Sequence, residues 1–361
     1  MKRTANDAPP ESDRFADTPH PRETFDLFGH AAVEVQLLDA WRAGRLPQSI
    51  ILGGPEGIGK ATLAWRLARF LLAHPDPASP EVAAAENLFV APTDPSARRI
   101  EALAHSDVFL LRREWNSERK RMRTEIRVDD VRHMIERFHQ ASASGGWRIA
   151  IVDAADDLNR SSANAMLKLI EEPPPRSLFL FVANRPARIM PTIRSRSRMV
   201  SLAPLSVADT IAAVRALGED WLDIDHDALD KAAARSGGSV KQALRLLDSD
   251  SGVLDDFDAI AARFPEVDWR TAHSLAEKVS SREKTEDFEA IVAAMFDWIS
   301  VEVRARAGTL PASGAGLAQL ADLWDKIAES ARQVEIYNLD RRPFMLTALN
   351  DLAGAARIPV Q

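Results

Sequence analysis

A short stretch from Gly53 to Thr62, GGPEGIGKAT, combines residue types and a spacing that could bind phosphate. The pattern G-x-x-x-x-G-K runs from Gly54 to Lys60, after an apolar run and before an amphipathic segment. In such a loop, backbone amides at the start of a helix hold phosphate, and the lysine reaches the β- and γ-phosphates. The residues that we expect to surround a phosphate are Gly54, Pro55, Gly57, Gly59, Lys60 and Thr62.

The position after the lysine lacks the group that normally holds magnesium. A Ser or Thr hydroxyl is the usual ligand there, and Ala61 offers only a methyl group. Thr62 lies about 100° further round the expected helix, so its hydroxyl cannot simply take over. We therefore expect the loop to bind ATP or ADP without hydrolysis, or to be retained for structure alone.

An acidic cluster offers the second half of a nucleotide site. In IVDAADD, Asp153 ends an apolar run, where a carboxylate that orders a metal ion belongs. A glutamate that positions the attacking water often follows, but this chain has Ala154. Asp156 and Asp157 are explained by a solvated turn or helix cap. The two losses together predict that this chain does not hydrolyse ATP by itself.

A basic run, PTIRSRSRMV, covers residues 191–200. Arg194, Arg196 and Arg198 alternate, so they would project to one side of the chain if it is extended. One interpretation is an ordinary solvated charge run. The other is an arginine that stabilises charge on the γ-phosphate of a nucleotide held by a neighbouring subunit. The residues alone leave both interpretations open.

Five apolar runs predict the strands that would position these groups, at 48–54, 107–111, 147–152, 178–182 and 198–202. They are continuously apolar, which is typical of a parallel sheet covered on both faces. The segments between them have helical periodicity. One helical face is formed by Ala163, Met166, Leu167 and Ile170, and three prolines at 173–175 end that helix. The pattern predicts a three-layer α/β domain.

The rest of the chain differs in pattern. The first 23 residues are polar, charged and rich in proline, which predicts disorder. After residue 204 the strand signals vanish and helical patterns continue to the end. We predict a disordered arm at 1–23, an α/β domain at 24–203, a small helical module at 204–250 and a helical domain at 251–361.

Composition restricts the possible functions. The 361 residues carry a net charge of −7 and contain no cysteine, which excludes disulfides, thiolate zinc sites and cysteine nucleophiles. Nucleic-acid binding would have to come from a local patch. No apolar run reaches the ~18 residues of a membrane span, and the start lacks a signal-peptide core. We expect a cytoplasmic protein with no membrane partner.

Several stretches together resemble one family, the δ′ subunits of the bacterial DNA polymerase III clamp loader. The run ANAMLKLIEEPPP followed by PTIRSR is specific to clamp-loader AAA+ proteins, whereas the phosphate loop alone is not. The resemblance extends from about residue 24 to the C-terminus and rests on LFGH, GRLPQSIILGGPEGIGKATLA, HSD, VDDVRHMIERF, GGWRIAIVDAADDLN and YNLDRR.

The resemblance implies a fold and a mechanism that spacing does not supply. Members of this family have an AAA+ domain, a helical lid (here 204–250) and a helical collar (here 251–361) through which five subunits form a ring. The implied partners are sister γ/τ and δ subunits, the sliding clamp, and primer–template DNA contacted through the assembly. A δ′ subunit is typically inactive as an ATPase, although it belongs to the polymerase holoenzyme.

The resemblance also assigns roles to single residues. The family's Ser-Arg-Cys motif matches Ser195-Arg196-Ser197, which makes Arg196 the arginine finger in trans and Arg194 a supporting charge. Asn184 falls at a polar sensor position. Lys241 in GGSVKQAL replaces a nucleotide-contacting arginine, and lysine cannot make the same bidentate contact. Many relatives carry a four-cysteine zinc module that residues 73–107 lack, so no zinc is expected.

Two other classes of function stay open as alternatives. One is a catalytically active AAA+ ATPase, either the motor subunit of the same loader or another machine. The other is a stand-alone DNA-binding module built on the locally basic segment at 112–127. Interleaved glutamates weaken that patch, and a solvated loop or hairpin explains it equally well.

Overall fold

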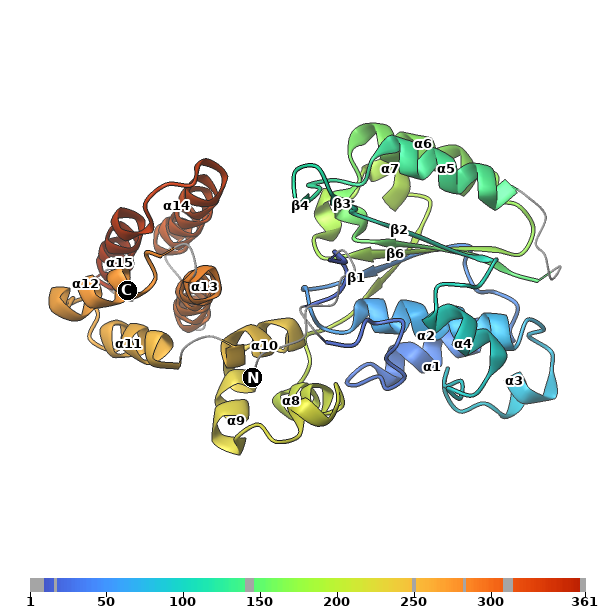
Figure 1. The fold of residues 1–361 in the computed structure, drawn as a ribbon, viewed down its shortest axis with the longest axis horizontal. Coiled ribbons are helices and arrows are strands. Elements are labelled where there is room, and N and C mark those ends of the chain that lie inside the picture. Colours follow the sequence, from blue (N-terminus) through green and yellow to red (C-terminus); the bar gives the residue numbers. More distant parts are fainter. Residues whose placement is uncertain are drawn as a thin grey trace. The chain divides into compact units, whose positions relative to one another are not determined.

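The computed structural model describes residues 10–15, 18–139, 146–248, 251–281, 284–307 and 314–357 (Figure 1). The chain divides into two compact units. The first contains Met1–Ala234 and Gly238–Lys241, and the second contains Arg235–Gly237 and Gln242–Gln361.

A five-stranded sheet forms the centre of the first unit. Its strands lie in the order β2-β5-β6-β1-β7, and every neighbouring pair is parallel. All five predicted strands are confirmed, with their ends shifted by at most one residue. Their bounds are Ser49–Gly53 for β1, Val108–Arg112 for β2, Arg148–Asp153 for β5, Ser177–Ala183 for β6 and Arg198–Ser201 for β7.

Helices cover both faces of this sheet, as Figure 1 shows. One layer contains α1 (Ala31–Arg42), α2 (Lys60–Ala73), α3 (Pro80–Ala84) and α4 (Pro95–Glu101). The opposite layer contains α5 (Val128–His139), α6 (Arg160–Glu171) and α7 (Pro191–Arg194). The predicted three-layer α/β domain is therefore confirmed.

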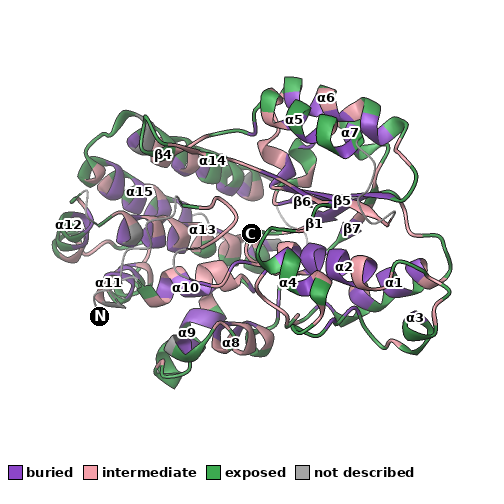
Figure 2. Cartoon of the chain, turned by 45° about the vertical axis from the view of Figure 1, so that its right-hand side comes forward, coloured by how far each residue is buried: buried purple, intermediate pink, exposed green. Residues whose placement is uncertain are grey.

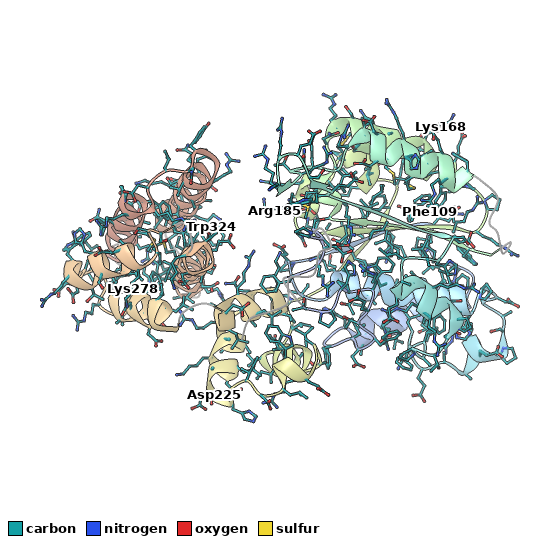
Figure 3. All side chains as sticks on the ribbon, viewed as in Figure 1. Phe109, Lys168, Arg185, Asp225, Lys278 and Trp324 are labelled. Carbon is teal, nitrogen blue, oxygen red and sulfur yellow. The ribbon has the colours of Figure 1, made fainter. Side chains whose placement is uncertain are left out.

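The continuously apolar strands fill two cores at once, because successive side chains point to opposite faces. In β1, Ile50 and Leu52 join the core beneath α1 and α2, while Ile51 joins the core beneath α5 and α6. Phe109 of β2 lies in the second core with its ring 5.1 Å from that of Phe138 (Figure 3). The helices flanking the sheet carry both buried and exposed residues (Figure 2).

Local sequence sets the ends of α6, the helix that precedes the proline run. The side chain of Asn159 accepts a hydrogen bond from the backbone amide of Ser162 at 2.9 Å, which caps the N-terminus. Ala163, Met166 and Ile170 are buried on one face, as predicted. Leu167 of the same predicted face is only half-buried, although it packs against that core. The helix ends at Glu171, before the prolines that cannot continue it.

The basic segment at 112–127 contains a small antiparallel hairpin, as one of its two interpretations predicted. Its strands are β3 (Trp115–Asn116) and β4 (Arg121–Met122), with Trp115 opposite Met122.

The chain after the sheet is helical, as expected. The helices α8 (Val207–Arg215), α9 (His226–Arg235) and α10 (Val240–Asp248) fall within the predicted module at 204–250. The two compact units do not separate at the borders of that module, because α8 lies in the first unit and most of α10 in the second.

The second unit consists of helices along its described residues. Their bounds are Ser251–Ala261 for α11, Trp269–Lys278 for α12, Thr285–Ala307 for α13, Gly314–Tyr337 for α14 and Arg341–Ala356 for α15. Of the helices that the structure describes, none is both long enough and apolar enough to cross a bilayer.

The N-terminal segment differs from the disorder expected for residues 1–23. Residues 10–15 and 18–23 lie on the first unit, with His20 fully buried. Glu11 and Asp13 form ion pairs with Arg112. These charged contacts hold a segment that has too few apolar side chains to be recognised as ordered by composition. Residues 1–9 lie outside the described part.

Candidate functional site

The predicted phosphate loop, residues 54–59, connects β1 to α2. Gly54 and Gly57 have φ values of +154° and +78°, which side chains disfavour. A Cβ atom would also lie 2.6 Å from the Leu202 carbonyl oxygen at Gly54, and 2.4 Å from Ser239 Oγ at Gly57. Glycine is therefore required by both the turn and its close neighbours.

Lys60 begins α2 and is directed back onto the loop. It is 3% exposed, and its ammonium donates a hydrogen bond to the Pro55 carbonyl oxygen. Burial lowers the pKa of the Lys60 ammonium to about 8, although Asp153 and Glu56 pull it upward. The ammonium that would contact phosphate is thus hydrogen-bonded to a backbone carbonyl of its own loop.

The magnesium position next to Lys60 carries no ligand. Ala61 packs its methyl group against the core beneath α1 and α2, and Thr62 is half-buried in the first turn of α2. Over the described residues, no group of three or more His, Asp or Glu side chains is arranged to hold a metal ion. The absence of zinc stays a prediction.

Asp153 is the last residue of β5, as predicted. It lies at the carboxyl ends of the strands, where the phosphate loop also lies. Burial, together with the nearby negative charge of Asp13, raises the pKa of the Asp153 carboxyl to about 8 against the opposing charge of Lys60. The next residue, Ala154, is 9% exposed and has no group that could position water.

The later aspartates of this cluster have structural contacts. Asp156 Oδ1 accepts a hydrogen bond from the Asn184 backbone amide at 2.9 Å. Asp157 forms a 2.8 Å ion pair with Arg113 Nε. Both lie in a short 3₁₀ turn, Ala155–Asp157, so a turn is confirmed, whereas the cap of α6 is Asn159 instead. Asn184, the predicted sensor, contacts this cluster through its backbone amide.

Lys241, predicted to replace a nucleotide-contacting arginine, lies against the phosphate loop. Its Nζ is 2.5 Å from Glu56 Oε1, and the adjacent Val240 amide donates to the Gly57 carbonyl oxygen at 2.8 Å. The loop, Asp153 and Lys241 therefore gather into one region of the first unit. Glu56 was not singled out in the sequence, because its partner is 185 residues away.

The alternation of arginines at 194, 196 and 198 does not place them on one side of an extended chain. Arg194 ends α7, Arg196 lies in the following turn and Arg198 begins β7. The condition of an extended chain is not met here, because the prolyl start at Pro191 favours a helical turn. The interpretation of Arg196 as a finger does not depend on it.

Arg196 is exposed. Its Nε lies 2.7 Å from Glu171 Oε1, and its Nη1 donates to the Thr192 carbonyl oxygen at 3.0 Å. The next residue, Ser197, is anchored instead: its Oγ lies 2.7 Å from Ser49 Oγ and 2.8 Å from the Ile193 carbonyl oxygen. Ser197 therefore fixes the turn to β1, whereas the guanidinium of Arg196 is exposed to solvent.

Comparison with known proteins finds one family model and several relatives. Residues 29–206 match a family model described as DNA polymerase III, delta subunit. A delta′ subunit from Pseudomonas aeruginosa is 32% identical over 54% of this chain and 54% of its own length. For the Escherichia coli delta′ subunit the identity is 28%, over 65% of each chain.

Gamma/tau subunits also match. One from Mycobacterium tuberculosis is 28% identical over 63% of this chain and 37% of its own length. The chain thus spans less than two thirds of each of these relatives. A solved gamma subunit-related protein from Thermotoga maritima covers 89% of this chain at 16% identity with a TM-score of 0.42.

The parallel sheet, its phosphate loop and the acidic residue that ends β5 together form a P-loop-like α/β domain. Residues 29–206 are therefore similar to the DNA polymerase III delta-subunit family, and the delta′ subunits among the relatives support a delta′-like clamp-loader subunit.

Proposed function

We propose that this chain is a clamp-loader subunit that does not hydrolyse ATP itself and donates Arg196 to a nucleotide held by a neighbouring subunit. One contrast carries the proposal. Lys60 is buried on its own loop carbonyl with no magnesium ligand beside it, whereas Arg196 is exposed on an anchored turn. The neighbour would be a gamma/tau-type subunit, because proteins of that name are among the relatives.

The loss of chemistry in this chain has three components. Ala61 cannot ligate magnesium, Ala154 cannot position water, and Lys241 is paired with Glu56. Hydrolysis of ATP depends on such groups to hold the metal ion, orient the nucleophile and stabilise charge. A nucleotide bound at this loop would therefore persist as ATP or ADP.

Arg196 has the chemistry that the neighbour's reaction requires. A guanidinium offers several donors in a fixed plane and remains charged, so it can stabilise the charge that develops on a transferring phosphoryl group. Its pair with Glu171 is exposed, and pairs of that kind contribute about 0–1 kcal/mol. A γ-phosphate in a dry interface can replace the carboxylate.

The wider role is what the resemblance to the δ′ subunits implies. The subunit would join gamma/tau-type and delta-type subunits in a five-membered ring through the helices of its second unit. The assembly would load a sliding clamp onto primer–template DNA. The chain's own contribution is a scaffold and one arginine.

Reconstitution tests this proposal. In an assembly where only the adjacent gamma/tau-type copy can hydrolyse ATP, Arg196→Ala is expected to slow hydrolysis by about 10³-fold. Arg188→Ala, which removes an exposed arginine outside the motif, serves as the matched control and is expected to change nothing. Unchanged hydrolysis with Arg196→Ala would overturn the proposal. So would turnover by the purified chain that disappears with Lys60→Ala.

A further inference from the structure

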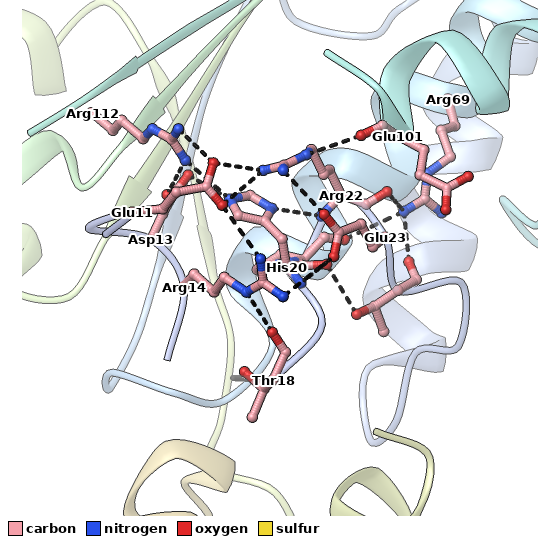
Figure 4. A network of polar contacts seen from close by, with 12 residues as sticks. Glu11, Asp13, Arg14, Thr18, His20, Arg22, Glu23, Arg69, Glu101 and Arg112 are labelled. Carbon is pink, nitrogen blue, oxygen red and sulfur yellow. Dashed lines mark hydrogen bonds and ion pairs between the residues drawn. The ribbon is translucent and has the colours of Figure 1, made fainter. Parts of the chain in front are cut away.

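The described residues ahead of α1 form a strap across the first unit, defined here as residues 10–15 and 18–23. The strap is tied to the end of β2 by Arg112 (Figure 4). Arg112 Nη2 lies 2.6 Å from Glu11 Oε1, and Nη1 lies 2.5 Å from Asp13 Oδ1. A second connection follows the same strand, because Ser12 Oγ donates to a backbone carbonyl of residue 113 at 3.0 Å.

His20 is the buried centre of this network. Its Nε2 lies 2.9 Å from Asp13 Oδ2, and both side chains are at most 1% exposed. Its Nδ1 accepts a hydrogen bond from the Arg22 backbone amide at 3.0 Å, so the ring hydrogen belongs on Nε2, facing Asp13. The imidazole also meets the Trp65 ring edge-on at 6.1 Å, which locks the strap against α2.

The far end of the strap is held by arginines. Arg22 Nε donates to the Glu101 carbonyl oxygen at 3.0 Å, which ties the strap to the end of α4. Arg69 of α2 donates to the Arg22 carbonyl oxygen at 3.1 Å. Arg22 Nη2 also lies 3.0 Å from Glu23 Oε1. The strap is therefore a built element with contacts to β2, α2 and α4.

The strap runs along the carboxyl ends of the strands, where the phosphate loop lies. Arg112, its anchor, is the register partner of Asp153 across the β2–β5 pair. At the other side of the loop, Lys241 Nζ lies 6.0 Å from the centre of the Phe15 ring and 2.5 Å from Glu56 Oε1. Ligands of parallel α/β sheets bind outside the carboxyl ends of the strands. The strap therefore crosses the position where a ligand would bind, between Arg112 on one side and Lys241 on the other.

We propose that the strap occupies the mouth of the phosphate loop and excludes nucleoside polyphosphates, with Asp13 and Phe15 as the excluding groups. Asp13 places a buried carboxylate where a polyphosphate would bring further negative charge. Phe15 covers the cation of Lys241. This concerns the chain's own loop and stands whether or not Arg196 acts on a neighbour.

Two further observations agree with a strap that covers the loop. The pKa of the Asp153 carboxyl is raised first by burial and second by the negative charge of Asp13, so the two carboxylates are neighbours. The Lys60 ammonium, with no phosphate to bind, is satisfied by the Pro55 carbonyl oxygen. The loop's own lysine is thus bonded within the loop, and the strap covers the loop from the solvent side.

Nucleotide binding to the full chain tests the strap. A fluorescent ATP analogue is titrated into the parent, into a double variant Asp13→Ala/Phe15→Ala, and into Asp26→Ala, which removes an exposed carboxylate between the strap and α1. The double variant is expected to bind at least tenfold more tightly than the parent and Asp26→Ala. Inorganic triphosphate should compete, and Lys60→Ala should remove the gain.

Two outcomes would overturn the strap proposal: equal affinity of the parent and the double variant, or no binding by either. Hydrogen exchange of the parent provides a second measurement that needs no variant. If strap and nucleotide exclude each other, saturating ATP must lower amide protection across residues 18–23. Higher protection contradicts the proposal, as does unchanged protection at an ATP concentration at which the titration shows the parent to be saturated. Neither result depends on Arg196, whose role the reconstituted assembly measures separately.

Discussion

Arg196 and Glu171 form an exposed ion pair across the gap between the end of α6 and the turn before β7. The Nε–Oε1 distance is 2.7 Å, and the side chains are 40% and 45% exposed. The residue expected to act on a neighbour's nucleotide is thus held, when alone, by a carboxylate of its own chain. An exposed pair contributes little to stability, so it can open at small cost.

Replacing Glu171 with glutamine tests this holding role. The free energy of unfolding should change by less than about 0.5 kcal/mol, because the pair is exposed and screened. Neighbour hydrolysis in the assembly should be unchanged or faster, since Arg196 no longer has to leave a carboxylate. Urea denaturation and assembly ATPase measure the two effects. A loss of hydrolysis as large as that of Arg196→Ala would instead show that Glu171 positions the guanidinium.

Replacing Lys60 with methionine tests whether the loop is retained for structure. We expect the variant to be as stable as the parent or more stable by about 1–2 kcal/mol, because a buried charge is replaced by an apolar chain of similar length. Asp153 would not be left charged, because burial already raises its pKa to about 8. Lys168→Met, on the exposed side of α6, is the control for a surface lysine.

Chemical denaturation of the Lys60→Met variant gives this free energy directly. A loss of more than about 2 kcal/mol would mean that the bond from Lys60 to the Pro55 carbonyl is essential to the loop. The interpretation of the lysine as a buried cation without its phosphate would then be wrong.

Asp153 predicts a dependence of stability on pH. Burial raises the pKa of its carboxyl in the folded chain to about 8, far above the ordinary value. The folded chain therefore holds a proton that the unfolded chain releases, so stability is lost as pH rises from about 4 to about 8. Lys60 is protonated in both states over most of that range and adds no slope there.

Asp153→Asn should remove this loss. The variant should exceed the parent in unfolding free energy by an amount that grows with pH, reaching on the order of 2 kcal/mol near pH 8. Denaturation at pH 5 and pH 8 measures the difference. Asp94→Asn, an acidic residue that caps α4 at a distance from the loop, should give no such growth with pH. A constant difference between Asp153→Asn and the parent would contradict the assignment of Asp153.

Ser197 stands where the resembling family has cysteine, and its contacts predict a modest structural role. Its hydroxyl lies 2.7 Å from Ser49 Oγ, which belongs to a 6% exposed side chain. Ser197→Ala should cost about 1 kcal/mol, because it leaves the Ser49 hydroxyl with one partner fewer. Ser197→Cys should cost less, since a thiol keeps a weak donor and acceptor. Thermal denaturation ranks the two variants, and the reverse order would contradict this role.

The sheet could be predicted from sequence because its information is local. Runs such as the one containing Ile50, Ile51 and Leu52 are apolar throughout, and the structure uses successive residues for opposite cores. The phosphate loop was predictable for the same reason, since its glycines and Lys60 are contiguous. Asp153 was predictable as the residue that ends such a run.

The contacts that close the site were not predictable, because they join distant residues. Lys241 pairs with Glu56 across 185 positions, and Arg112 reaches the strap across about a hundred. The strap itself has the composition of a disordered segment, and its order comes from contacts with β2, α2 and α4. The turn at Arg196 was not predicted, because alternating arginines fit an extended segment as well as a loop, whereas the structure has a short helix from Pro191 to Arg194 ahead of it.

One comparison tests the central claim most directly: ATP hydrolysis by the reconstituted assembly with this chain as parent, as Arg196→Ala and as Lys60→Met. We predict that Arg196→Ala slows the neighbouring subunit by about 10³-fold and that Lys60→Met leaves its rate unchanged. The reverse result, with the rate lost on Lys60→Met and kept on Arg196→Ala, would show that the chain uses its own loop and would contradict the account.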